Sequence, residues 1–131
     1  MELKRGVLYK RGAGGFLKRK NWKRRYFVLR DDEIRYFDTH NGCQKGTIKL
    51  QGCSKSVEIQ PADCHKTGNS ASTEWRIAIN TPTRRFFIST ATEFEMYEWA
   101  EALQYAIELA NDAQACRSTL STSADECFQE G

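Results

Sequence analysis

The residues best suited to chemistry in this chain are lysines and arginines at the ends of two strand-like runs. The runs GVLYKR (6–11) and WKRRYFVL (22–29) flank a short loop rich in Gly, Lys and Arg. If the runs pair as an antiparallel hairpin, Lys10 ends one strand, and Lys23 and Arg25 begin the next. The hairpin then gathers three cations at one end. Together with the loop cations, such a group is suited to binding a multiply phosphorylated ligand.

Alternation of side chains along the strands predicts that these cations face inward. Lys10 shares a face with Leu8, and Arg25 shares a face with Phe27. The apolar residues belong in the core, which forces the cations onto the interior rim of the sheet. A buried cation is costly unless it is paired, so the rim is either solvated or paired with loop acids, or it is an empty anion site. We favour the anion site, because the acids at 31–33 lie at the far end of the hairpin.

The distribution of charge supports a polyanionic partner. The chain has 131 residues and a net charge of +3. Residues 1–30 contain eleven Lys and Arg and one acid, a net charge of +10. Residues 31–131 contain nine Lys and Arg and sixteen acids, a net charge of −7. An asymmetry of this size steers the basic end toward phosphorylated lipid headgroups, an anionic membrane or nucleic acid. The run LKRKNWKRR could suggest nucleic acid, but its strand pattern argues against a free basic peptide, and we expect no nucleic-acid binding.

Other classes of function find little support in the sequence. The five cysteines form no CxxC pair and the N-terminus lacks the apolar core of a signal peptide, which favours a reduced, cytoplasmic protein. His40 and His65 are isolated and no Cys/His group has zinc-ligand spacing, so we expect no metal and no cofactor. No nucleophile–base pair or carboxylate dyad can be identified, and we predict no enzyme activity. No run is long and apolar enough to span a membrane.

The pattern of strands and one helix predicts an α+β fold. A capping box at Thr92 and Glu95 opens an amphipathic helix with Trp99 as its main core anchor, ending near 111–115. We expect a domain at 1–115 and a disordered tail or linker at 116–131. The sheet would be bent or form a partly open barrel with the helix plugging one end. The strand-like runs are Gly6–Arg11, Trp22–Leu29, Glu33–Asp38, Gly46–Gln51, Ser56–Gln60, Glu74–Asn80 and Arg84–Ser89.

These motifs resemble the pleckstrin homology domain family over about residues 3–112. The opening GVLYKRG, the run WKRRYFVL, the run IRYFD and the tryptophan-bearing C-terminal helix carry the resemblance. It implies a bent seven-stranded antiparallel sheet capped at one end by the helix. It also implies a phosphoinositide-binding signalling module that is recruited peripherally to a membrane, and we expect this to be the plasma membrane.

The resemblance also implies roles for individual residues. Phosphoinositide-binding members have a Lys ending the first strand and Lys-x-Arg opening the second, which matches Lys10, Lys23 and Arg25. Lys10 and Arg25 would contact a 3-phosphate, Lys23 would help to hold the headgroup, Tyr36 would donate a hydrogen bond to a phosphate, and Lys45 would add a basic contact. The signature favours 3-phosphorylated inositol lipids, either the trisphosphate or the 3,4-bisphosphate.

The loop between the first two strands is a candidate for membrane contact. Phe16 and Leu17 could enter the bilayer interface, or they could fold back onto the strands. The cations beside them would be attracted to anionic lipid, and they are Arg11, Lys18, Arg19 and Lys20. An alternative function is a protein-interaction domain of the same fold, in which the acidic helix face or a sheet edge binds a partner and membrane binding is weak and nonspecific.

Overall fold

The chain forms seven antiparallel strands and one long C-terminal helix. A computed structural model describes residues 1–12, 22–64 and 72–130, with side chains as far as residue 113. A 3-10 turn (Ala62–Cys64) follows the fifth strand. The strands are β1 (Glu2–Arg11), β2 (Trp22–Arg30), β3 (Glu33–Phe37), β4 (Gln44–Lys49), β5 (Glu58–Ile59), β6 (Arg76–Asn80) and β7 (Arg85–Ser89), and the helix is α1 (Glu93–Glu130).

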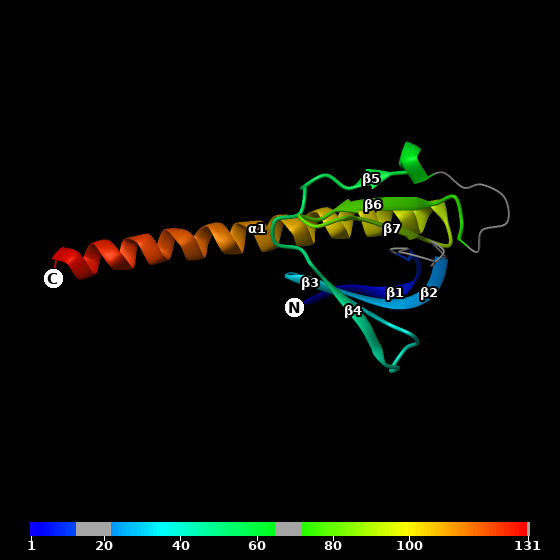
Figure 1. The fold of residues 1–131 in the computed structure, drawn as a ribbon, viewed down its shortest axis with the longest axis horizontal. Coiled ribbons are helices and arrows are strands. Elements are labelled where there is room, and N and C mark those ends of the chain that lie inside the picture. Colours follow the sequence, from blue (N-terminus) through cyan, green and yellow to red (C-terminus); the bar gives the residue numbers. More distant parts are fainter. Residues whose placement is uncertain (13–21, 65–71, 131) are drawn as a thin grey trace.

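The strands make one open sheet with β1 at its centre. The strand order is β4-β3-β2-β1-β7-β6-β5, and all described neighbours are antiparallel. Figure 1 shows the two halves of the sheet facing each other, β1–β4 on one side and β5–β7 on the other. The helix α1 contacts both halves, through β1 and β2 and through β5 and β6. The seven predicted strands are confirmed, and β1 begins four residues earlier than expected. The sheet is bent but does not close into a barrel.

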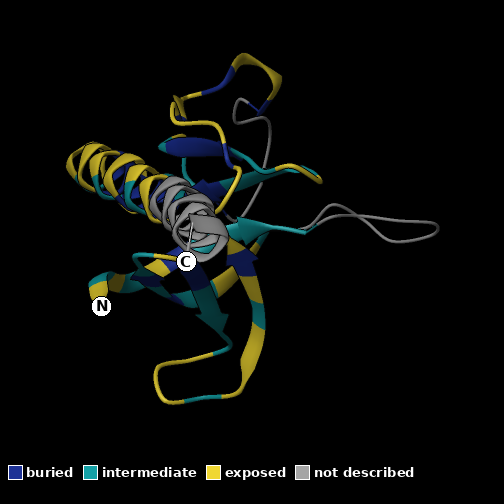
Figure 2. Ribbon diagram, turned by 90° about the vertical axis from the view of Figure 1, so that its left-hand side faces the viewer, coloured by how far each residue is buried: buried dark blue, intermediate teal, exposed yellow. Residues whose placement is uncertain are grey.

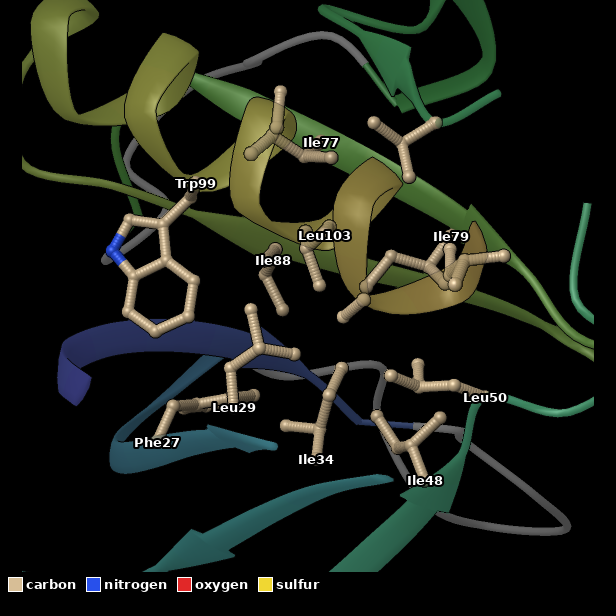
Figure 3. Packing of buried hydrophobic residues seen from close by; sticks show 14 of the residues in the cluster. Phe27, Leu29, Ile34, Ile48, Leu50, Ile77, Ile79, Ile88, Trp99 and Leu103 are labelled. Carbon is tan, nitrogen blue, oxygen red and sulfur yellow. The ribbon is translucent and has the colours of Figure 1, made fainter. Parts of the chain in front are cut away.

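Alternating apolar residues of both halves build the core, and α1 closes it. Leu8, Phe27 and Ile88 are each 1% exposed on the inner face of the sheet. Trp99 and Leu103 point from α1 into this layer (Figure 3), and both are buried. Trp99 is therefore a core anchor of the helix, as its position in the amphipathic pattern predicts.

The start of α1 is fixed by a capping arrangement. Thr92 Oγ1 accepts a hydrogen bond from the Glu95 amide at 3.2 Å, as a capping box requires. Glu95 reaches back one residue further than expected and accepts from the Ala91 amide at 3.2 Å. Both bonds satisfy amide groups that the first turn of a helix leaves without partners. The sequence signal for the start of the helix is thus confirmed.

The end of α1 differs from the prediction. The helix does not stop near residues 111–115 but continues to Glu130, and its last turns extend beyond the sheet (Figure 1). The stretch after Ala110 contains neither Gly nor Pro before Gly131, so the residues that commonly end a helix are missing. The division into a domain at 1–115 and a tail at 116–131 stays a prediction.

Candidate anion-binding site

The pairing of β1 with β2 brings the predicted cations together. Lys10 lies opposite Lys23, and Leu8 lies opposite Arg25. Leu8 is buried, so the face it shares with Lys10 and Arg25 is the inner one. Arg25 Nη1 donates to the carbonyl oxygen of Arg24 at 2.9 Å, which restrains the guanidinium. The inward placement expected from the alternation is therefore confirmed for Lys10 and Arg25.

Tyr36 forms one wall of this site. Its ring stacks on Phe27 with 5.6 Å between centroids, and the Lys10 ammonium lies 5.0 Å from its centroid. Tyr36 pairs with Gly46 across β3 and β4. A Cβ on Gly46 would collide with the Tyr36 hydroxyl, so only glycine allows the ring to lie across β4 in this way.

Arg84 and Phe86, which the sequence interpretation did not place in the site, complete it. The Arg84 guanidinium lies 3.6 Å from the centroid of the Phe86 ring, and Lys10 Nζ lies 5.3 Å from the same centroid. Thr81 anchors the turn before β7, because its hydroxyl donates to the Arg84 carbonyl oxygen at 2.7 Å. A signal was present: Arg84 is two residues before Phe86 and four before the buried Ile88, on the alternation that places Lys10 after Leu8.

We call Lys10, Arg25 and Arg84 the cation cluster. The positive charges of the two arginines repel the Lys10 ammonium. The pKa of Lys10 falls to about 8, first because the side chain is partly buried and then because of the charges of Arg84 and Arg25. An anion that entered between these groups would relieve this repulsion. The local electrostatics therefore favour an anion next to Lys10.

No carboxylate offsets this charge in the part of the chain whose side chains are described. Ion pairs there leave out all three members of the cation cluster. The contrast with the adjacent Arg85 is direct, since Arg85 pairs with Glu58 and, at 2.9 Å, with Asp63. The two segments outside the described residues, 13–21 and 65–71, contain no Asp or Glu in the sequence.

Three other predicted residues have different surroundings. Lys23 is exposed beside Lys10. Lys45 is also exposed and occupies a register shift, because Tyr36 pairs with Gly46 whereas the next residue pairs with Gln44. The structure describes no contact between Lys45 and the cation cluster. Alternation puts Arg11 on the face opposite Lys10. It donates to the Cys64 sulfur at 3.4 Å and lies 5.2 Å from the Phe87 ring centroid.

The rest of the predicted membrane contact lies outside the described residues. Phe16, Leu17, Lys18, Arg19 and Lys20 all fall in the segment 13–21. Their role stays a prediction. The described site contains one ammonium, two guanidiniums and a phenol next to the rings of Tyr36 and Phe86. These groups can donate hydrogen bonds to several phosphate oxygens.

Comparison with known proteins agrees with the fold. The PH domain family matches residues 2–108. Pleckstrin of Canis lupus familiaris is 37% identical over 109 residues, covering 79% of this chain and 29% of that protein. The chain thus spans less than a third of the length of this relative.

Solved structures give the same result. The C-terminal PH domain of human pleckstrin is 31% identical with a TM-score of 0.66, covering 84% of this chain and 91% of that one. The C-terminal PH domain of pleckstrin in complex with D-myo-Ins(1,2,3,5,6)P5 is 31% identical with a TM-score of 0.63, covering 82% and 96%. The bent open sheet, the capping helix and the match over residues 2–108 show that the chain belongs to the PH domain family.

Proposed function

We propose that this chain is a non-catalytic module that binds the phosphorylated headgroup of inositol lipids and prefers headgroups with a 3-phosphate. The observation that carries the proposal is the cation cluster, a partly buried lysine with two arginines and no acidic partner among the described side chains. A pleckstrin PH domain of similar structure was solved with an inositol pentakisphosphate, which supports a ligand of this class.

Each member of the site has a role in the proposal. Arg25 and Arg84 would hold phosphate oxygens through paired N–H groups, and Lys10 would lie between them as a point charge. Tyr36 would donate its hydroxyl to a phosphate. Lys23 would add a contact from the rim, and Lys45, the residue at the register shift in β4, would reach the headgroup from beside Tyr36.

Binding of such a headgroup would recruit the domain to a membrane surface. Peripheral recruitment is typical of PH domains, and no helix of the described part is long and apolar enough to cross a bilayer. We place this recruitment at the cytoplasmic side of the plasma membrane. Phe16 and Leu17 would enter the lipid interface, and Arg11, Lys18, Arg19 and Lys20 would add attraction of about 1 kcal/mol each near anionic lipid.

Calorimetric titration with soluble headgroups tests the proposal. Inositol 1,3,4,5-tetrakisphosphate should bind at least about tenfold more tightly than the 1,4,5-trisphosphate, because the 3-phosphate adds charge-assisted hydrogen bonds of about 1.5–3 kcal/mol each. Arg25→Ala should weaken binding of the tetrakisphosphate by about 10- to 100-fold. Arg30→Ala is the matched control, since it removes the same charge from the far end of β2, where Arg30 lies 4.0 Å from Asp32.

Two results would contradict the proposal. Unchanged affinity in Arg25→Ala would show that the headgroup does not bind at the cation cluster. Equal affinity for the two headgroups would leave general attraction to anions without recognition of the 3-phosphate.

A further inference from the structure

The outward side of α1 carries a stripe of aromatic and acidic side chains that nothing in the described structure covers. Phe94, Glu98, Glu101, Tyr105 and Glu108 follow one another at intervals of three or four residues, so they share one face of the helix. The buried helix residues lie on the opposite face. We call these five residues the helix stripe. Figure 2 shows this side of α1 as exposed.

The aromatic members are unusually open to solvent. Phe94 is 72% exposed and Tyr105 is 53% exposed, and Tyr97 beside them is 51% exposed. These three make up half of the six large hydrophobic residues that the described part of the chain exposes. Burial of exposed aromatic rings supplies much of the binding energy at protein interfaces, so this gathering on one helix is a candidate contact surface.

The charge of this surface has one sign. Residues 93–113 of α1 contain six acids and no Lys, Arg or His. Glu95 is engaged at the start of the helix, and Glu98 pairs with Lys4. Within the described residues, Glu101 and Glu108 form no ion pair or side-chain hydrogen bond. Two carboxylates thus flank the exposed ring of Tyr105 without a cation.

A surface hollow runs beside the stripe between α1 and the start of β1. Its volume is about 560 Å³, and Leu3 and Ala102 give it apolar patches between the acids. The stripe contributes to its lining, together with Lys4 and Gln104. The hollow can therefore receive side chains from a partner that lies along the helix.

Lys4 shows how this surface accommodates a cation. Its ammonium lies 4.0 Å from a Glu98 carboxylate oxygen and 5.4 Å from the centroid of the Trp99 ring. A carboxylate and an aromatic ring thus hold the same ammonium. Glu101, Tyr105 and Glu108 offer the same combination further along the helix, and no described side chain forms an ion pair with either of these carboxylates.

We infer that the helix stripe and this hollow form a docking site for a lysine- and arginine-rich segment of another protein. Its cations pair with Glu101 and Glu108, and its apolar residues cover Phe94 and Tyr105. Anionic lipid is excluded as the occupant by the charge of the surface. The site is also separate from the anion site: Lys4 is six residues before Lys10 along β1, about 20 Å in an extended strand. One molecule can therefore hold a headgroup and a basic partner together.

Fluorescence anisotropy with the full chain and a synthetic peptide tests this inference. The probe is a labelled amphipathic helix of about 15 Lys and Leu residues, because Phe94 to Glu108 spans about 21 Å of helix. The double variant Glu101→Lys/Glu108→Lys should lose at least tenfold in affinity for the probe. Tyr105→Ala, which keeps the charge, should also weaken binding.

A charge-matched control separates docking from general attraction. Glu74→Lys/Glu93→Lys changes the net charge equally, and neither residue belongs to the stripe. This control should retain affinity for the peptide within about twofold, and both doubles should bind the tetrakisphosphate like the wild-type chain. The inference is overturned if the peptide does not bind at physiological salt, if both doubles lose equal affinity, or if the stripe double binds normally. It is also overturned if the stripe double abolishes self-association of the free chain, since a second copy would then be the occupant.

Discussion

Raising the pH should weaken headgroup binding through one side chain, Lys10. Its pKa of about 8 means that the ammonium loses its proton within the range in which the protein can be studied. A bound phosphate raises this pKa, because an opposite charge stabilises the ammonium. The proposed ligand therefore binds best to the protonated form, and binding should take up protons.

The size of the effect follows from the fraction of Lys10 that is protonated. With a pKa of about 8, roughly nine-tenths of the free protein carries the charge at pH 7 and roughly one-tenth at pH 9. Affinity should therefore fall by about tenfold between these values. Further ionisation of the phosphates over this range affects the wild-type chain and a Lys10→Arg variant alike, so the difference between the two isolates the contribution of Lys10.

Calorimetry in two buffers of different ionisation enthalpy measures both the affinity and the number of protons taken up on binding. At pH 8 about half a proton should be taken up for each tetrakisphosphate bound. Lys10→Arg is the control, since a guanidinium stays charged throughout the range and should remove the pH dependence. A flat affinity from pH 7 to pH 9, or the same slope in Lys10→Arg, would refute the reasoning.

Three further changes test the structure. Lys10→Met should abolish binding of the tetrakisphosphate yet raise the free energy of unfolding by about 1 kcal/mol at pH 7, after allowance for solvent screening. The gain should fade near pH 10, because the lowered pKa of Lys10 means that the unfolded chain holds the proton more tightly than the folded chain does. Urea unfolding measures the change, and a loss of stability would contradict it. Gly46→Ala should displace the Tyr36 ring and cost about 1–3 kcal/mol, seen as a lower melting temperature and weaker headgroup binding, whereas wild-type values for both would exclude the collision. Glu33→Gln should lower the free energy of unfolding by about 1–2 kcal/mol at neutral pH, because Arg35 and Lys49 lower the pKa of Glu33. This contribution is present above about pH 4.5 and is lost as the pH falls through the lowered pKa. A difference in stability from wild type that persists at about pH 2 would count against the ion pairs.

Alternation was enough to predict the strands and their inner faces. Leu8 and Phe27 mark the inner face of β1 and β2, and the cations on the same alternation follow them to the rim. These are local patterns with a period of two residues, so a single sequence contains them. The helix start at Thr92 was equally readable, because its cap is made within four residues.

Features that depend on distant contacts were harder to predict. Arg84 lies far from Lys10 in the sequence, and the pairing of β1 with β7, the strand that begins directly after Arg84, brings the two residues together. The register shift at Lys45 depends on how Tyr36 packs over Gly46, which alternation alone does not indicate. The extension of α1 could not be predicted from periodicity, because a polar stretch without an apolar pattern also fits a disordered tail, although this stretch lacks the residues that end a helix.

The central position of β1 has a consequence for the order in which the molecule acquires its properties. Tyr9 pairs with Ser89, and Lys10 pairs with Ile88, so this seam can close only after most of the domain has been synthesised. Contacts between such distant segments form slowly during folding. Until the seam closes, the hairpin of β1 and β2 holds Lys10 and Arg25, while Arg84 belongs to a separate meander. Full headgroup affinity should therefore appear only once this seam has closed, which makes it a kinetic reporter of the β1–β7 pairing.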